Sequence, residues 1–434
     1  MEKEMGKNEK FTDSITFKSL IVGILILVMF IPNVMIQNLI YERKERSRET
    51  IRTINEKWSL AQKITGPILA VPYITTLLNS QNQEVKSEHV LYVAPQELDI
   101  DVELFPEERY YGIYKAMLYQ SRVKIKGNFS TLKDLSVPNS EIHWEKASVL
   151  LGISDLRGVV SHAKMNLQGK ELDVKAGEWI KGDENALIFD VSDGDFWNDE
   201  GNINYHCELK LNGSEKMNFI PVGKNSHVVV KGVWPSPGFI GKFSPTYTIS
   251  TNGFEASWNV LEINRAIPAT WTENTQPYFD GSSFGICLVE MVDHYQQNTR
   301  SAKYSMLFIA LTFLVFFFVE LLTKKRIHPV QYLLVGLALM IFYTLLLSIS
   351  ERIGFGIAYF IASIATISLI TGYAYSIFKN LKTTSILFGL LFALYLFLYM
   401  ILQMEDTALL IGSIGLFVIL GVAMYASRKV KWYK

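Results

Sequence analysis

The chain has 434 residues, and lysine plus arginine equal aspartate plus glutamate, so the formal net charge is zero. This balance argues against a nucleic-acid-binding protein, which needs a clustered basic surface. The length allows two or three structural units. The only cysteines, Cys207 and Cys287, are too few for a disulfide framework or a thiolate metal cluster.

The first apolar segment, residues 20–40, has the length of a membrane-spanning helix. Its interior breaker, Pro32, is tolerated in membrane helices, where neighbouring groups satisfy the freed carbonyl. No small-residue cleavage pattern follows, so we interpret the segment as an uncleaved anchor rather than a signal peptide. Residues 1–19 then form a short tail before the anchor.

Residues 41–65 are expected to continue the anchor as a helical stalk. Apolar residues recur at helical spacing on one face of this otherwise charged segment, at Ile51, Ile54, Trp58 and Ala61. The pair Gly66-Pro67 combines two helix breakers and is expected to end the helix.

Residues 66–303 are expected to form a β-rich domain, because apolar and polar residues alternate there with the two-residue period of strands. The clearest runs are Leu98, Ile100, Val102 and Leu104, and Ile203, Tyr205, Cys207, Leu209 and Leu211. Turn pairs such as Asn212-Gly213 and Asn252-Gly253 separate such runs. About a dozen short strands with little helix favour a large antiparallel domain, sandwich-like or built of paired sheets.

Five further apolar segments follow in close succession, each without charge through its middle: residues 304–322, 330–350, 355–377, 385–402 and 408–425. At a rise of about 1.5 Å per residue, such lengths match the roughly 30 Å hydrocarbon core of a bilayer. The expected fold is therefore six transmembrane helices, one before and five after a mainly-β extramembrane domain. Small residues four apart, at Gly354, Ala358 and Ala362 and at Ala408 and Gly412, favour a packed bundle over a pore.

Loop charges predict the orientation of these helices, because cytoplasmic loops carry an excess of lysine and arginine. Positive residues gather after the second, fourth and sixth helices, at Lys324, Lys325, Arg326, Lys379, Lys382, Arg428, Lys429, Lys431 and Lys434. Both termini, residues 1–19 and 426–434, are thus expected in the cytoplasm, with residues 41–303 outside. Basic residues just after the anchor oppose this assignment, but long translocated domains obey the rule poorly.

Catalytic and metal-binding templates do not fit this sequence. It contains no H-E-x-x-H or G-x-S-x-G motif, and Gly223-Lys224 lacks the rest of a phosphate-binding loop. An acidic cluster contains Asp190, Asp193, Asp195, Asp199 and Glu200. Because its spacing does not match a calcium loop, we interpret it as a surface turn.

The histidines are scattered without metal-ligand spacing: His89, His143, His162, His206, His227, His294 and His328. We therefore predict no catalytic, cofactor-binding or metal-binding residue. Cys207 lies on an apolar strand face and is expected to be a buried free thiol. A Cys207–Cys287 bridge is the alternative if the exterior is oxidising.

Glu320 is the one candidate for a proton or ion path, because ionisable groups inside membranes usually have such roles. It lies near the expected cytoplasmic edge and four residues before Lys324. An ion pair between these two residues at the interface is the simpler expectation.

The chain resembles the CreD family of bacterial inner-membrane proteins, most clearly over residues 293–350. This region contains KYSMLFIALTF at residues 303–313 and HPVQYLLVGL at residues 328–337. Weaker similarity lies at residues 66–72, 112–114, 157–158, 223–226 and 238–241. The resemblance implies a cytoplasmic N-terminus, a large periplasmic domain and a C-terminal helix cluster. It also implies a link to envelope integrity and to a carbon-source-responsive regulon, but no catalytic or ligand residues.

We expect a non-enzymatic inner-membrane protein that contributes to cell-envelope integrity or stress response. In this hypothesis the periplasmic domain binds an envelope protein, lipid or glycan, and the helices contact the lipid bilayer. The alternative is a transporter or lipid-handling protein that uses the C-terminal bundle. A sensor for a kinase partner, or an enzyme whose site assembles from distant strands, ranks below these.

Overall fold

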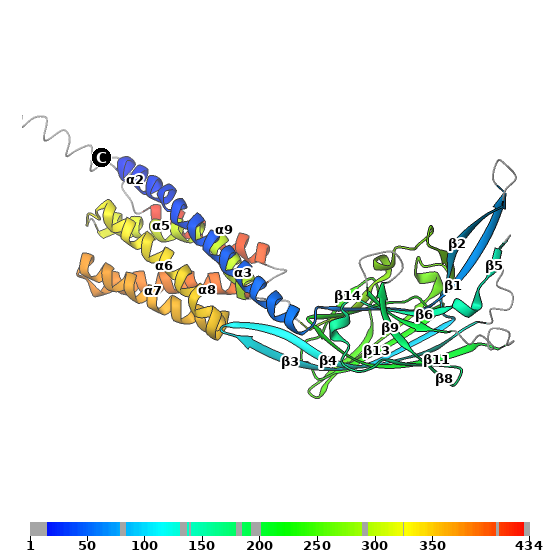
Figure 1. Ribbon diagram of the computed structural model, residues 1–434. Coiled ribbons are helices and arrows are strands. Elements are labelled where there is room, and N and C mark those ends of the chain that lie inside the picture. The colour runs from blue at the N-terminus through cyan, green and yellow to red at the C-terminus, as the bar shows by residue number, and fades with distance from the viewer. Residues whose placement is uncertain are drawn as a thin grey trace, which may run out of the picture. The chain divides into compact units, whose positions relative to one another are not determined.

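The computed structural model describes residues 15–78, 84–130, 137–138, 140–178, 185–191, 201–288, 294–323, 325–404 and 408–428. The chain forms two compact units. The helical unit contains Met1–Arg48 and Val292–Lys434, and the β unit contains Glu49–Met291. Each unit has its own hydrophobic core, and Figure 1 shows the elements of both.

Two helices begin the described chain, α2 (Ile15–Val28) and α3 (Phe30–Trp58), with only Met29 between them. The interruption has a physical cause, since Pro32 lacks the N–H that would bond the carbonyl of residue 28. Backbone bonds from Met29 to Leu25 and from Asn33 to Met29 continue the ladder across it. Thr16–Trp58 therefore forms one long apolar-to-charged helical stretch of 43 residues.

The predicted end of the stalk is wrong. The helix ends at Trp58, and strand β1 (Gln62–Leu78) already contains Gly66 and Pro67. A bulge separates Thr65 from Ile68 in the pairing of β1 with its neighbour. Gly66 has φ +105°, and an added Cβ would lie 2.8 Å from the Leu150 carbonyl oxygen. The two supposed helix breakers thus form a strand bulge, which also favours glycine.

The C-terminal helices are α4 (His294–Lys303), α5 (Ser305–Thr323), α6 (Pro329–Ile353), α7 (Phe355–Phe378), α8 (Leu381–Gln403) and α9 (Ala408–Ser427). Five described stretches are long and apolar enough to cross a membrane, namely Thr16–Trp58 and helices α5 to α8. The apolar part described in α9, Leu410–Tyr425, is shorter, so a sixth span stays a prediction. The sequence predicts residues 294–303 to belong to the β domain. This prediction is wrong, because they form α4 in the helical unit.

Small residues allow close packing in the helical unit at some of the expected positions. Ala358 and Ala362 are fully buried on α7. Gly354 instead separates α6 from α7 with φ +82°, and an added Cβ there would meet no atom within 4 Å. Gly336 on α6 and Gly415 on α9 lie in tighter surroundings, because an added Cβ would lie 2.7 Å from Met29 Sδ at the first and 2.1 Å from Phe397 Cζ at the second.

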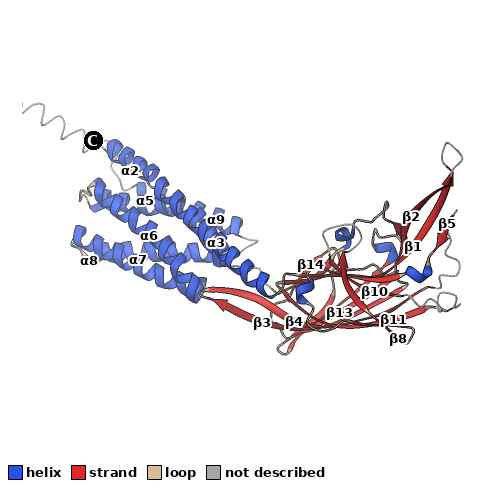
Figure 2. Ribbon diagram, in the orientation of Figure 1, coloured by secondary structure: helices blue, strands red, loops and turns tan. Residues whose placement is uncertain are grey.

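The β unit contains a ten-stranded and an eight-stranded sheet; strands are red in Figure 2. The ten-stranded sheet is ordered β14 (Gly238–Gly241), β18 (Phe284–Cys287), β12 (Lys216–Ile220), β1, β6 (Ser148–Ile153), β10 (Asn185–Asp190) and β9 (Val174–Glu178), with β2 (Glu84–Val93), β5 (Ser140–Ile142) and β17 (Thr270–Thr272) beside this path. The eight-stranded sheet is ordered β15 (Thr246–Ser250), β16 (Gly253–Leu261), β13 (Asn225–Gly232), β3 (Glu97–Tyr111), β4 (Tyr114–Phe129), β11 (Ile203–Ser214), β7 (Lys164–Leu167) and β8 (Lys170–Leu172).

The predicted β domain is therefore present, with two differences. The described chain has eighteen strands rather than about a dozen, because many are too short to show alternation. The sheets are also not purely antiparallel, since β1 pairs with β12 and β13 pairs with β3 in parallel. One hydrophobic core joins the two sheets, with contributions such as Ile125 and Cys207 from one and Phe219 and Ile286 from the other.

Candidate functional site

The outer face of the eight-stranded sheet is strongly charged. Along β3, buried residues alternate with Asp99, Asp101 and Glu103. Along β4 the outward residues are instead cationic, and each lies opposite an anion, in the pairs Asp99–Lys126, Asp101–Lys124 and Glu103–Arg122. Opposite charges in directly paired positions stabilise a sheet, so β4 forms a cationic stripe beside an anionic one.

A groove of about 410 Å³ lies on this face, on the side of β4 away from β3. We call it the cationic groove. Its ionisable lining consists of Arg122, Lys124, Lys164, Lys210, His162, His206, Glu171 and Glu208. Four permanent cations and two carboxylates line the open groove, and Arg122 also pairs with Glu103 beside it at 3.4 Å. The charge balance at the groove is therefore positive before either histidine is protonated.

The carboxylates neutralise only part of this charge. Lys164 pairs with Glu171 at 2.8 Å, and the longer Lys124–Glu208 contact is 3.7 Å. Both pairs are exposed, so each contributes little to stability and its lysine is free to rearrange. The Lys210 ammonium has no ion-pair partner among the described residues. The groove thus offers charged N–H donors to an anion, for which charge-assisted hydrogen bonds are the strongest contacts.

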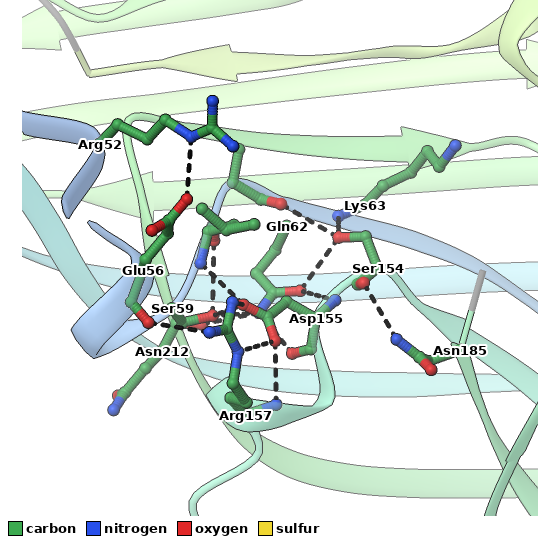
Figure 3. A network of polar contacts seen from close by, with 12 residues as sticks. Arg52, Glu56, Ser59, Gln62, Lys63, Ser154, Asp155, Arg157, Asn185 and Asn212 are labelled. Atoms are coloured by element: carbon green, nitrogen blue, oxygen red, sulfur yellow. Dashed lines mark hydrogen bonds and ion pairs between the residues drawn. The ribbon is translucent and has the colours of Figure 1, made fainter. Parts of the chain in front are cut away.

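A second polar cluster, the junction network, lies where α3 passes into β1 (Figure 3). Asp155 accepts hydrogen bonds from the Leu60 backbone N–H at 2.9 Å and from the Arg157 guanidinium at 2.8 Å. Gln62 Nε2 donates to Ser59 Oγ and to the carbonyl oxygens of Asp155 and Asn212. The network thus satisfies the backbone of the turn between helix and strand.

The charge of Asp155 is stabilised by this arrangement. Burial alone would raise its pKa, but the hydrogen bonds from Arg157 and from the backbone N–H groups of Leu60 and Arg157 outweigh burial and lower it. Gly158 is required beside the network, because an added Cβ would lie 2.3 Å from the Asn212 carbonyl oxygen and 2.4 Å from Gln62 Nε2. Sequence reasoning noted residues 157–158 only as a similarity and did not predict the network.

The described residues of types that bind metals do not form a cluster. Of the acidic cluster, Asp190 lies on β10 and pairs with Lys175, whereas residues 192–200 lie outside the described part. Within the described ranges, no three histidine, cysteine, aspartate or glutamate side chains form a group that could hold a metal ion. Gly223-Lys224 lies in the turn between β12 and β13, where the Arg265 guanidinium bonds the Gly223 carbonyl.

The histidines and cysteines are dispersed over the fold. His89 contacts Glu273, His206 contacts Glu208, and His328 caps the start of α6. Cys207 and Cys287 are both buried and free, so the expected free thiol is confirmed and the alternative bridge is absent. Burial, with a smaller effect of Glu208, raises the pKa of the Cys207 thiol to about 12.

Glu320 is buried within the helical unit, with only 4% of its surface exposed. Lys18 Nζ lies 2.7 Å from Glu320 Oε1, and the Tyr332 hydroxyl donates to Oε2 at 2.9 Å. Lys324 lies outside the described residues, so the expected interfacial pair between Glu320 and Lys324 stays a prediction. The carboxylate is held between α2, α5 and α6.

Three comparisons relate the chain to known proteins. A family model described as inner membrane protein CreD matches residues 14–433. The chain is 31% identical over 417 residues to the inner membrane protein CreD of Escherichia coli (strain K12), covering 94% of this chain and 91% of that protein. The solved structure of native yeast LTA4 hydrolase aligns with 55% of this chain and 36% of its own length, at 8% identity and a TM-score of 0.20. That structural likeness is too low to support any argument.

Proposed function

Because the chain belongs to the CreD family of inner membrane proteins, we propose that it supports cell-envelope integrity as a non-catalytic binding protein. Its β unit lies in the periplasm and binds an anionic group of another envelope component. The observation that carries this proposal is the cationic groove, where four lysine and arginine side chains face two carboxylates.

The proposed orientation is supported by contacts within the helical unit. Lys18 near the start of α2 pairs with Glu320 near the end of α5. Lys325, just after α5, donates to the Phe378 carbonyl at the end of α7. The N-terminus of α2 and the ends of α5 and α7 therefore lie at one end of the bundle. Lys324, Lys325, Arg326 and Lys379 follow those helix ends, which favours the cytoplasm for this end.

The function is tested by complementing a strain that lacks the gene. Wild type and Lys210→Glu are expressed at equal levels, and sensitivity to detergents and β-lactams is measured. Lys126→Glu is the matched control, because it reverses an outward charge on β4 outside the groove. We expect Lys126→Glu to restore resistance and Lys210→Glu to fail. Full restoration by Lys210→Glu would argue against the groove, and no phenotype in the deletion strain would argue against the envelope role.

The second candidate function is transport or lipid handling by the bundle, and Glu320 is the observation that favours it. A buried carboxylate in a membrane bundle is a default candidate for an ion path. Its two contacts with Lys18 and Tyr332 nevertheless satisfy it within the fold. If Glu320→Gln abolished complementation while the folded protein stayed abundant, transport would become the leading hypothesis.

A further inference from the structure

Strand β15 ends the eight-stranded sheet, and its outer edge is open in the described structure. It pairs only with β16, and all five of its residues are exposed. An unpaired edge presents backbone N–H and C=O groups that can bond another strand. Natural proteins usually protect such edges with charge, proline, bulges or very short strands.

The other terminal strands carry that protection, and β15 does not. At the opposite end of the same sheet, β8 has three residues and includes Lys170 and Glu171. In the ten-stranded sheet, β9 carries Lys175 and Glu178, and β14 has only four residues. Strands β5 and β17, which also have one partner each, have three residues. The sequence of β15 is Thr-Tyr-Thr-Ile-Ser, with no charge, proline or glycine. It is therefore the edge best suited to strand addition.

The side chains of β15 also leave apolar surface uncovered. Tyr247 and Ile249 lie opposite Ala256 and Phe254 of β16, which are buried in the core. They therefore point to the core face of the sheet, yet 53% of Tyr247 and 48% of Ile249 remain exposed. A strand added beside β15 would extend this face and cover both side chains.

We propose that β15 pairs antiparallel with β15 of a second copy of this chain and joins the two eight-stranded sheets. The sequence is complementary to itself about Thr248. Antiparallel pairing centred there places Tyr247 opposite the second copy's Ile249, Thr246 opposite its Ser250, and Thr248 opposite its own equivalent. Aromatic with β-branched residues, and threonine with threonine or serine, are favourable cross-strand pairs. No like charges meet, and both apolar pairs fall on the core face.

Cysteine crosslinking in native membranes tests this register with the full-length chain. Directly opposed residues in antiparallel strands have Cα atoms about 4.5–5.5 Å apart, within the span of a disulfide. Thr248→Cys is therefore expected to form a covalent dimer under mild oxidation. Crosslinking through the native thiols should be low, because Cys207 and Cys287 are buried. The chain without an added cysteine serves as the control for this background.

Thr246→Cys and Ser250→Cys are matched controls on the same strand and face. Each would lie about 13 Å from its own equivalent, four residues away along the strand, so neither alone should crosslink. Cells that express both variants together should yield the dimer. We expect Thr248→Cys, and the mixed pair, to give at least tenfold more dimer than either control alone. Adding Ile249→Lys, which places a charge on the joined face, should remove the Thr248→Cys dimer.

Two results would overturn the proposal. Equal crosslinking of all three single variants would indicate random collision, and the absence of both the Thr248→Cys and the mixed dimer would show that this edge does not pair with itself. Either result, obtained with folded protein that elutes as one species in detergent, would leave the edge free for an extended segment of another protein.

Discussion

Lys18 contacts Glu320, and a second contact between Asn33 and Ser305 joins the same helices, so the N-terminal helices run antiparallel to α5. Lys18 Nζ lies 2.7 Å from Glu320 Oε1, and Ser305 Oγ donates to Asn33 Oδ1 at 2.6 Å. The two contacts lie fifteen residues apart along the N-terminal helices and fifteen residues apart along α5. At 1.5 Å per residue this is about 22 Å of helix. One buried and one partly buried polar contact thus fix how the N-terminal helices lie along α5.

Glu320→Ala is expected to destabilise the helical unit, because it leaves Lys18 and the Tyr332 hydroxyl without their partner. Breaking a buried ion pair from one side costs about 3–5 kcal/mol. The partly exposed Lys18 can reach water, so the lower end of that range applies. Thermal unfolding in detergent measures the loss. Lys18→Met combined with Glu320→Gln should recover stability, and an unchanged melting temperature for Glu320→Ala would contradict this role.

Asp155→Asn is expected to change how stability depends on pH. The pKa of Asp155 is lowered from 3.8 in the folded state, so the unfolded chain binds this proton more readily. Its stabilising effect is therefore complete well above pH 3.8 and is lost as the pH falls through the lower folded value. Denaturation of wild type and variant from pH 7 to pH 3 measures this. The difference between them should shrink in acid, and a constant difference would contradict the prediction.

Gly158→Ala is expected to destabilise the β unit by about 1–3 kcal/mol, the usual cost of forcing an extra methyl group into packed structure. The methyl group would strike the Asn212 carbonyl oxygen and Gln62 of the junction network. Gly201→Ala is the matched control, because an added Cβ there meets no atom within 4 Å. Chemical denaturation compares the two variants, and similar midpoints would show that the network tolerates displacement.

Lys210→Glu is expected to weaken binding of an anionic glycan probe to the full chain in neutral-lipid discs. A hydrogen bond to a charged group contributes about 1.5–3 kcal/mol, so the dissociation constant for dextran sulfate should rise about tenfold or more. Lys126→Glu should leave it nearly unchanged, and neutral dextran should not bind either protein. Equal weakening by both variants would indicate general charge attraction rather than binding in the groove.

Cys207 is expected not to react with a thiol reagent at pH 8 while the chain is folded. Its side chain is fully buried, and the pKa of about 12 leaves almost no thiolate, the reactive form. Mass spectrometry after maleimide treatment should find Cys207 modified only in denatured protein. Rapid modification in the folded chain would show that the inner face of β11 opens to solvent.

The sequence revealed the elements whose pattern is local. Alternation along Leu98–Leu104 marked the interior face of β3, and uninterrupted apolar runs marked α5 to α8. The sequence-based prediction was wrong where the same residues are compatible with two structures. Gly66 and Pro67 occur in a strand bulge as readily as at a helix end. The contact of Glu320 with Lys18 was also missed, because the two residues lie 302 positions apart in the sequence and local spacing gives no sign of it.

In the candidate site, too, the local features could be predicted from the sequence, whereas the contacts between distant segments could not. That outward residues of β4 are cationic follows from alternation, but the groove depends on which strands lie beside β4. Strand β7 pairs with β11 although 35 residues of chain lie between the end of β7 and the start of β11. That pairing brings Lys164 into the same groove as Lys124 and Lys210. Such neighbours are set by sheet order, which no single stretch of sequence encodes.

The Lys18–Glu320 contact also imposes an order on assembly. The ribosome makes Lys18 302 residues before Glu320, which at about 5–20 residues per second is a delay of roughly 15–60 seconds. During that interval the entire β unit is synthesised. The charge of Lys18 and the side chain of Asn33 lack their later partners, Glu320 and Ser305, for this time. The bundle therefore cannot close around its oldest helix until α5 has been made, and an insertion factor that shields Lys18 and Asn33 would act in that window.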